Sequence, residues 1–301
     1  LHGASFAGGE GGSHDFEAAK KQAASEKKDL LLDFTGSDWC GWCIKLNDEV
    51  FKKEPFKAGV KDSFVLVELD YPNDKSKLSE ETQKQNKELG EKYAIQGYPT
   101  ILLCDAGGKP FAATGYQPDG PEKYVEHLNT LRGNKAKRDE AFASAAKAKG
   151  VEKAKALVAA LDAMELEDAM VANFYGDIVS QITAADPKDE TGFAKKAASK
   201  KRFAEFQEKL QEFGQKQDHD GALGLVEKTI KEGDLLKDDT QQVMMIRAAI
   251  LLQQKKFDEA LKAVDEAKAF QPDGEIAEQI DGFRKRIEAS KAKAAGAPAG
   301  K

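Results

Sequence analysis

The chain reads DWCGWCIK at residues 38–45, between a short apolar run, Leu30–Phe34, and a stretch with helical character. Two cysteines three positions apart at the start of a helix lie on one side of its first turn, close enough to form a disulfide. The first of them, Cys40, meets the unpaired N–H groups and the dipole end that stabilise a thiolate. We therefore expect Cys40 to attack a substrate disulfide and Cys43, one turn further in, to resolve the mixed disulfide.

Two other roles for this cysteine pair fit the sequence less well. A structural zinc site needs four ligands, usually with a second Cys-x-x-Cys or a closely spaced His pair, but only Cys104 and four scattered histidines remain. A permanently closed disulfide over so short a loop gives little entropic stabilisation. Cys104 follows two leucines in a predicted strand, where a free cysteine behaves as a small buried hydrophobe. Redox chemistry is therefore favoured, and no metal is expected.

The composition excludes several classes of protein. Of the 301 residues, 41% are hydrophobic and 33% are charged, which is typical of a soluble protein. The apolar runs are shorter than the roughly 18 residues that a membrane-spanning helix needs, so no membrane span is expected. The net charge of −6 argues against nucleic acid as a partner, because such binding depends on Lys and Arg side chains that neutralise phosphates.

The chain divides into segments of different character. Residues 14–133 alternate between helical patterns and short apolar runs, which predicts an α/β domain whose sheet is covered by helices on both faces. Residues 134–289 contain no convincing strand and predict an all-α domain. The small, Gly-rich residues 1–13 and the Lys/Ala/Gly/Pro-rich residues 290–301 are expected to be flexible ends. The predicted strands are Leu30–Phe34, Phe64–Asp70, Pro99–Cys104 and Pro110–Ala113.

Three segments, in this order, resemble the thioredoxin superfamily: LDF at residues 32–34, the cysteine motif, and YAIQGYPT at residues 93–100. The resemblance covers about Asp15–Arg132 and is strongest to the thioredoxin-like proteins of bacterial cell envelopes. It implies a central mixed sheet and a thiol–disulfide oxidoreductase that acts on protein disulfides. It also implies a cis peptide bond between Tyr98 and Pro99 facing the dithiol, with the Tyr98 backbone binding a substrate strand. No cofactor is implied, because electrons come through another dithiol protein.

The resemblance leaves two candidates for the carboxylate that helps to move the proton of the resolving thiol. The family commonly has a buried Asp six positions before the first cysteine, whereas Asp33 lies seven positions before Cys40. An Asp inside an apolar run is costly to bury unless it has a partner or a role. Glu68, in the neighbouring predicted strand, is the competing candidate. The lysine that often accompanies the Asp in thioredoxins has no clear counterpart in that strand.

The residues between and beside the cysteines are candidates for substrate binding. Trp42 stands where thioredoxin itself has a proline, so the direction of electron flow cannot be transferred from thioredoxin. The superfamily geometry implies that Trp42 is exposed and faces the substrate, and that Trp39 packs beside the dithiol. Together with Gly41, Tyr98 and Pro99, the two tryptophans form the predicted substrate-binding set.

One stretch of the helical half resembles a repeat motif. Phe257–Ala260, followed by Ala267 and Pro272, is similar to the second helix of a tetratricopeptide repeat. Stacks of such repeats offer a surface that binds a protein or a peptide. We expect a tetratricopeptide-like or otherwise irregular helical domain, which either binds a protein partner or serves only to pack on the redox domain or to dimerise.

Two functions are compatible with these features. The first is an enzyme that reduces, forms or reshuffles disulfides in other proteins and is regenerated by a redox partner. The second is a binding protein whose helical domain recruits a partner while the dithiol only senses redox state. The Gly-rich segment Leu1–Ser13, which does not begin with Met, favours an exported, for example periplasmic, protein.

Overall fold

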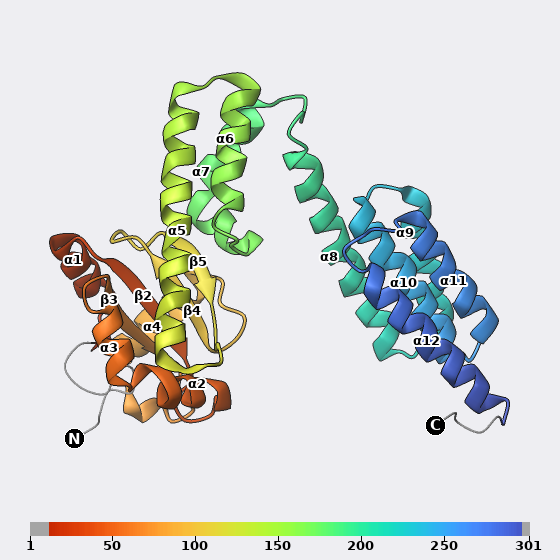
Figure 1. The fold of residues 1–301 in the computed structure, drawn as a ribbon, viewed down its shortest axis with the longest axis horizontal. Helices are drawn as coiled ribbons and strands as arrows, with labels where there is room; N and C mark the ends of the chain where they lie inside the picture. The colour runs from red at the N-terminus through yellow and green to blue at the C-terminus, as the bar shows by residue number, and fades with distance from the viewer. Residues whose placement is uncertain (1–11, 297–301) are drawn as a thin grey trace. The chain divides into compact units, whose positions relative to one another are not determined.

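The structure is a computed structural model that describes residues 12–296 and consists of two compact units, residues 1–191 and 192–301 (Figure 1). The segments predicted to be flexible, residues 1–13 and 290–301, lie partly outside the described residues. Residues 1–11 and 297–301 lie outside the described residues, whereas Gly12–Ser13 form a strand and residues 290–294 belong to a helix. In the described part of the chain, no helix has both the length and the apolar character to cross a bilayer.

The first unit is built on a five-stranded mixed sheet, which confirms the predicted fold class. Its strands are β1 (Gly12–Ser13), β2 (Asp29–Thr35), β3 (Phe64–Asp70), β4 (Thr100–Cys104) and β5 (Pro110–Thr114). β1 and β2 are both parallel to β3, and β4 is antiparallel to β2 and to β5. The spatial order is β1-β3-β2-β4-β5, so β2, which leads into the cysteine motif, lies at the centre of the sheet.

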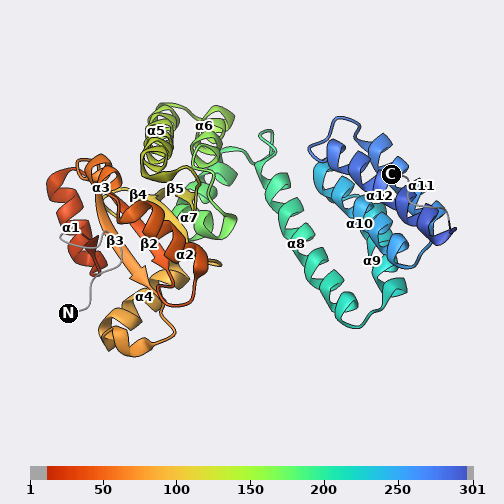
Figure 2. The same cartoon turned by 60° about the horizontal axis from the view of Figure 1, so that its bottom comes forward.

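Helices cover both faces of this sheet (Figure 2). α1 (Phe16–Glu26) and α4 (Glu80–Lys92) pack on one face. The other face carries α2 (Gly41–Leu46), the π-helix η1 (Asn47–Phe51), α3 (Glu54–Val60) and α5 (Gly120–Lys147). On this second face, the rings of Phe51, Phe56 and Tyr124 pack against one another.

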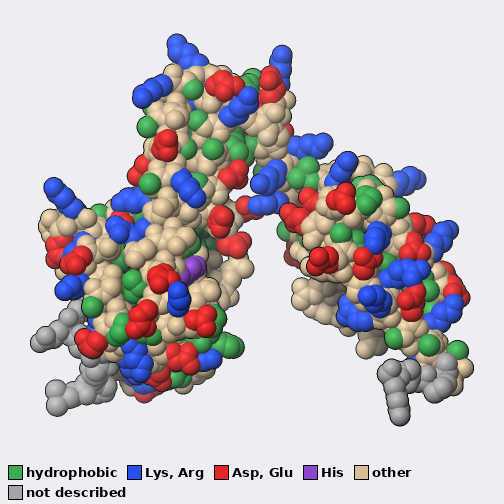
Figure 3. All heavy atoms as spheres, in the orientation of Figure 1, with side chains coloured by type: hydrophobic (Ala, Val, Ile, Leu, Met, Phe, Trp, Pro, Cys, Tyr) green, Lys and Arg blue, Asp and Glu red, His purple; other side chains and the backbone are tan. Residues whose placement is uncertain are grey.

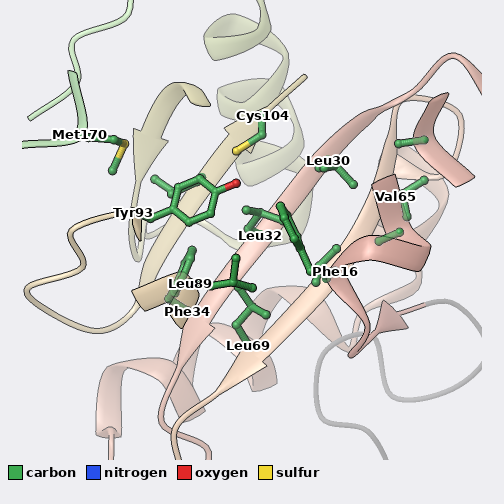
Figure 4. Packing of buried hydrophobic residues seen from close by; sticks show 14 residues of the cluster. Phe16, Leu30, Leu32, Phe34, Val65, Leu69, Leu89, Tyr93, Cys104 and Met170 are labelled. Carbon is green, nitrogen blue, oxygen red and sulfur yellow. The ribbon is translucent and has the colours of Figure 1, made fainter. Parts of the chain in front are cut away.

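The core between the sheet and α1 and α4 is shown in Figure 4. Alternate residues of β2 and β3 point into it, because successive side chains of a strand face opposite sides of the sheet. The rings of Phe16 and Tyr93 meet edge to face in this core, with centroids 6.2 Å apart. The strand residues that contribute are Leu30, Leu32, Phe34, Val65, Val67, Leu69, Leu102 and Cys104. The intervening residues, which include Asp33 and Glu68, therefore face the side of α2 and α5.

A helical arm completes the same core. The sequence predicts a helix that ends near Leu131, but α5 continues to Lys147, because no Pro or Gly follows Gly133 until Gly150. α6 (Gly150–Asp162) and α7 (Asp168–Ala185) then return to the sheet. Met170 of α7 joins the core, as Figure 4 shows. The domain boundary expected at Gly133 thus lies within a helix of the first unit, which extends to Thr191; the domain limits stay a prediction.

The second unit consists of helices throughout its described part, as predicted. They are α8 (Phe193–Gln215), α9 (His219–Glu232), α10 (Lys237–Gln253), α11 (Phe257–Phe270) and α12 (Ala277–Ala294). One apolar cluster forms around Phe206 and Val226, and another around Val264 and Ile280. Acidic and basic side chains are interspersed on the faces drawn in Figure 3, and some are paired, such as Arg284 with Asp265 at 2.9 Å. The assignment to a tetratricopeptide-like repeat stays a prediction.

Candidate active site

The two cysteines of the motif are joined by a disulfide at the start of α2. Cys40 is the N-cap residue of this helix, with an extended backbone, and its Sγ accepts a hydrogen bond of 3.2 Å from the N–H of Cys43. The Cα atoms of the two cysteines are 5.2 Å apart, and both side chains are buried. The helix terminus therefore directs an otherwise unpaired N–H group at the Cys40 sulfur, as a thiolate at this position requires.

The loop that precedes Cys40 is fixed to the end of β3 and to the segment that follows it. The backbone N–H and the hydroxyl of Ser37 donate to the Asp70 carboxylate over 2.9 and 2.6 Å. The Asp38 carboxylate accepts hydrogen bonds from the backbone N–H groups of Asn73 and Asp74 and from Lys77. The bond from Asn73, followed by that from Lys77, lowers the pKa of Asp38 to about 2. These bonds hold the loop, although it is one residue longer than the family commonly has.

Trp39 is packed on one side and exposed on the other. Its indole N–H donates to the Tyr71 carbonyl oxygen over 2.8 Å, and its ring meets that of Tyr98 edge to face, with centroids 5.5 Å apart. A Cβ atom on Gly36 would lie only 2.5 Å from the indole, so the ring needs a glycine beneath it. The side chain is nevertheless 46% exposed.

Trp42 is the most exposed large hydrophobic side chain of the described residues, at 57%. Its ring packs against that of Tyr116, with centroids 5.1 Å apart, and the Lys45 ammonium lies over both rings. The Tyr116 hydroxyl donates to Glu49 over 2.6 Å. The two tryptophans thus present aromatic surface on either side of Cys40.

The peptide bond between Tyr98 and Pro99 is cis, as the resemblance implies. The Tyr98 ring links two parts of the site, because it contacts both Trp39 and Tyr71. Beside it opens a cavity of about 770 Å³, with Tyr71, Leu78 and Ile95 among its walls. Apolar surface therefore continues from Trp39 through Tyr98 toward α4.

The two candidate carboxylates lie side by side. Asp33 of β2 is in register with Glu68 of β3, and both side chains are buried. Within the described part of the chain, Oδ1 of Asp33 has no hydrogen-bond partner. Burial raises the pKa of Asp33 well above its ordinary value, and the nearby carboxylates of Glu68 and Asp70 raise it further. Asp33 therefore holds its proton more tightly than an exposed Asp does.

Cys104 lies apart from this chemistry. It is fully buried in the core, next to Tyr93, and burial raises the pKa of its thiol well above its ordinary value. A thiol in this setting is inert, in agreement with the sequence interpretation. Among the described residues, no three His, Cys, Asp or Glu side chains come together to hold a metal ion.

The sequence interpretation left three members out of the site: Asp38, Tyr71 and Tyr116. It assigned no role to either tyrosine. A usable signal existed, since Tyr71 directly follows β3 and Tyr116 lies two residues beyond β5. β3 and β5 both run in the direction of β2, so the residues that follow them lie at the same end of the sheet as the cysteine motif.

Comparisons with known proteins match this part of the chain. Residues 16–131 match the family model described as a thioredoxin-like domain. The chain is 35% identical over 115 residues to "Disulfide bond reductase DsbH" of Chlamydia pneumoniae, covering 38% of this chain and 69% of that protein. It is 33% identical over 89 residues to "Thioredoxin-related protein DsbJ" of the same organism, covering 30% of this chain and 25% of that protein. A solved structure titled "DsbH Oxidoreductase" shares 33% identity, covers 39% of this chain and 81% of that one, and gives a TM-score of 0.38.

Proposed function

Since the chain belongs to the thioredoxin-like family and is a thiol–disulfide oxidoreductase, we propose that Cys40 is its attacking thiol and Cys43 its resolving thiol. The observation that carries the proposal is the Cys40–Cys43 disulfide at the start of α2. In the reduced protein, the Cys40 thiolate attacks one sulfur of a substrate disulfide and releases the other as a thiolate. Cys43 then attacks Cys40, releases the second substrate thiol and closes the disulfide. Two electrons pass from the dithiol to the substrate.

The substrates are proteins that contain disulfides, bound on the surface around Cys40. Two features support this assignment. Trp39 and Trp42 offer exposed aromatic surface, which suits a polypeptide partner. A Cβ atom placed on Gly41 would meet nothing within 4 Å, so a substrate backbone has room to approach the cysteines. Tyr98, the predicted contact of the substrate backbone, borders this surface, because its ring meets that of Trp39.

The physiological direction is reduction, and a second dithiol protein returns the electrons. The support for this direction is the name of the relative DsbH, a disulfide bond reductase. The resemblance to cell-envelope proteins supports an exported location. A protein partner of the helical unit is a further part of this proposal, and it rests only on the similarity of Phe257–Ala260 to a tetratricopeptide repeat.

A reduction assay on the full chain tests the assignment. We expect the reduced protein to cleave the disulfides of insulin, and Cys40→Ser to abolish this activity. Cys43→Ser is expected to accumulate a mixed disulfide with the substrate, visible by mass spectrometry. Cys104→Ala is the matched control and retains the activity. If Cys40→Ser reduces insulin as fast as the unaltered protein, the assignment is wrong.

A further inference from the structure

Three titratable residues form one row across the sheet. Asp33 on β2 is in register with Glu68 on β3, and Ser13 on β1 is in register with Val67, so His14 comes beside Glu68. Nδ1 of His14 lies 3.9 Å from Oε1 of Glu68. Because the strands follow the order β1-β3-β2, the row runs from the centre of the sheet to its edge.

Exposure to solvent changes along this row. Asp33 and Glu68 are each only 4% exposed, whereas the His14 side chain is 41% exposed. Asp33 lies on the sheet face that carries α2, η1, α3 and α5, where Tyr124 of α5 is its neighbour, and η1 directly continues the helix that carries Cys43. The row therefore leads from the buried sheet face that carries the dithiol helix to the surface.

We infer that Glu68 and His14 form a proton relay that connects buried Asp33 with solvent during disulfide exchange. This inference rests on the proposed function. The second exchange step needs the Cys43 thiol to lose a proton, and an ionised Asp33 accepts it as the Cys43 sulfur attacks Cys40. The substrate leaves as a thiolate. Asp33 then passes the proton to Glu68, Glu68 passes it to His14, and the imidazolium releases it to solvent, which restores Asp33 for the next turnover.

The relay is needed because Asp33 retains protons. Its burial and the proximity of Glu68 and Asp70 favour the neutral acid, and no hydrogen-bond donor stabilises the charge on Oδ1 within the described part of the chain. An acid in this state cannot act as a base until its proton has left. An imidazole side chain can both accept and donate a proton, which suits the outer end of such a path.

Other titratable groups near Asp33 are engaged elsewhere. The Asp70 carboxylate accepts both hydrogen bonds from Ser37. Tyr124 of α5 also faces Asp33, but its hydroxyl donates to the Gly115 carbonyl oxygen over 3.0 Å. Glu68, by contrast, lies next to both Asp33 and the exposed base His14.

The test is a stopped-flow measurement of disulfide closure in weakly buffered solution between pH 5.5 and 8.5. Trp39 and Trp42 flank Cys40, so tryptophan emission reports the closure. Reduced full-length chain is mixed with a peptide disulfide, and we compare His14→Gln and Glu68→Gln with His219→Gln, a matched change in the second unit. Attack by Cys40 is measured separately in the Cys43→Ser background.

We expect His14→Gln and Glu68→Gln to slow closure by about tenfold, less than the loss of a group that transfers the proton directly. Free imidazole restores the rate of His14→Gln, whereas the attack by Cys40 and the rate of His219→Gln are unchanged. Thermal unfolding of the two relay variants confirms that they fold. The relay is overturned if His14→Gln closes at the unaltered rate, or if imidazole does not restore it. Failure of the unaltered protein to close the disulfide instead contradicts the proposed function.

Discussion

The ring of Phe174 on α7 packs on the ring of Tyr93, with centroids 4.6 Å apart. The neighbouring Tyr175 donates its hydroxyl to the Pro110 carbonyl oxygen over 2.7 Å, and Asn173 donates to the Lys92 carbonyl oxygen over 2.9 Å. The α5–α7 arm is therefore bound to the sheet domain through both apolar packing and hydrogen bonds. The folded core of the sheet domain therefore includes residues beyond residue 131, where the match to the family model ends.

Two truncated variants test the role of this arm. A chain that ends at Thr191 keeps the arm and is expected to fold and to reduce a model disulfide. A chain that ends at Gly133 loses Met170, Phe174 and Tyr175, and we expect it to be less stable by several kcal/mol, since burial of one large apolar side chain contributes about 1.5–3 kcal/mol. Denaturant unfolding followed by circular dichroism measures the difference. Equal stability of the two variants would show that the arm is dispensable.

The raised pKa of Asp33 predicts how the stability of the protein depends on pH. In the folded state its pKa is raised, so the folded protein binds this proton more tightly than the unfolded chain does. The stability therefore falls as the pH rises above the ordinary Asp value of 3.8 toward the raised one. We expect Asp33→Asn to raise the melting temperature, by more at pH 8 than at pH 5, while it slows disulfide closure.

Asp48→Asn serves as the control for Asp33→Asn. Asp48 is exposed and pairs only with Lys52 in the described residues. The difference in melting temperature between Asp48→Asn and the unaltered protein should therefore be the same at pH 5 and pH 8. A gain in stability for Asp33→Asn that is the same at both pH values would contradict the assignment of a buried proton to Asp33.

The lowered pKa of Asp38 predicts the opposite dependence of stability on pH. Its pKa is lowered to about 2, so the stability it contributes is present above the ordinary value of 3.8 and is lost as the pH falls toward 2. At neutral pH, Asp38→Ala is expected to free the N–H groups of Asn73 and Asp74, with faster amide hydrogen exchange in that segment. The acid-induced loss of stability should be smaller in this variant. Unchanged exchange at both amides would rule out the proposed fixation of the loop.

Gly36 controls the position of Trp39. A methyl group in Gly36→Ala would lie 2.5 Å from the indole, so the ring must move away and lose its hydrogen bond to Tyr71. We expect a change in tryptophan emission together with slower reduction of protein substrates. Gly133→Ala is the control, since a Cβ atom there meets nothing within 4 Å. An unaltered emission spectrum in Gly36→Ala would contradict the described packing.

Local patterns in the sequence were sufficient for the parts of the fold that local chemistry determines. The apolar run Leu30–Phe34 lies within β2, and the cysteine motif begins a helix as predicted. The end of α5 was not predicted correctly, because one glycine in a helix costs only about 1 kcal/mol, and tertiary packing overrides it. β1 was missed because Gly12–Ser13 carry no apolar pattern and pair only through their backbone with β3.

In the candidate site, too, features set by local sequence were predicted, whereas features set by long-range contacts were not. The spacing alone pointed to Cys40 and Cys43, which the structure joins in a disulfide, and the resemblance implied the cis peptide bond that is found at Pro99. The sequence offered Asp33 and Glu68 as alternatives, because the register between residues 35 positions apart is a long-range property. Only the structure shows that they are neighbours, and that His14 continues the row.

The most direct test of the account is a redox titration of the full chain in glutathione or dithiothreitol buffers, read by tryptophan emission and by mass spectrometry of alkylated thiols. We predict that Cys40 and Cys43 convert together from dithiol to disulfide, with a midpoint near −270 mV, about that of a thioredoxin-like reductant, while Cys104 stays reduced. A midpoint above about −200 mV would contradict the reducing direction. Cysteines that never pair at any buffer ratio would contradict the assignment of Cys40 and Cys43 as the redox couple.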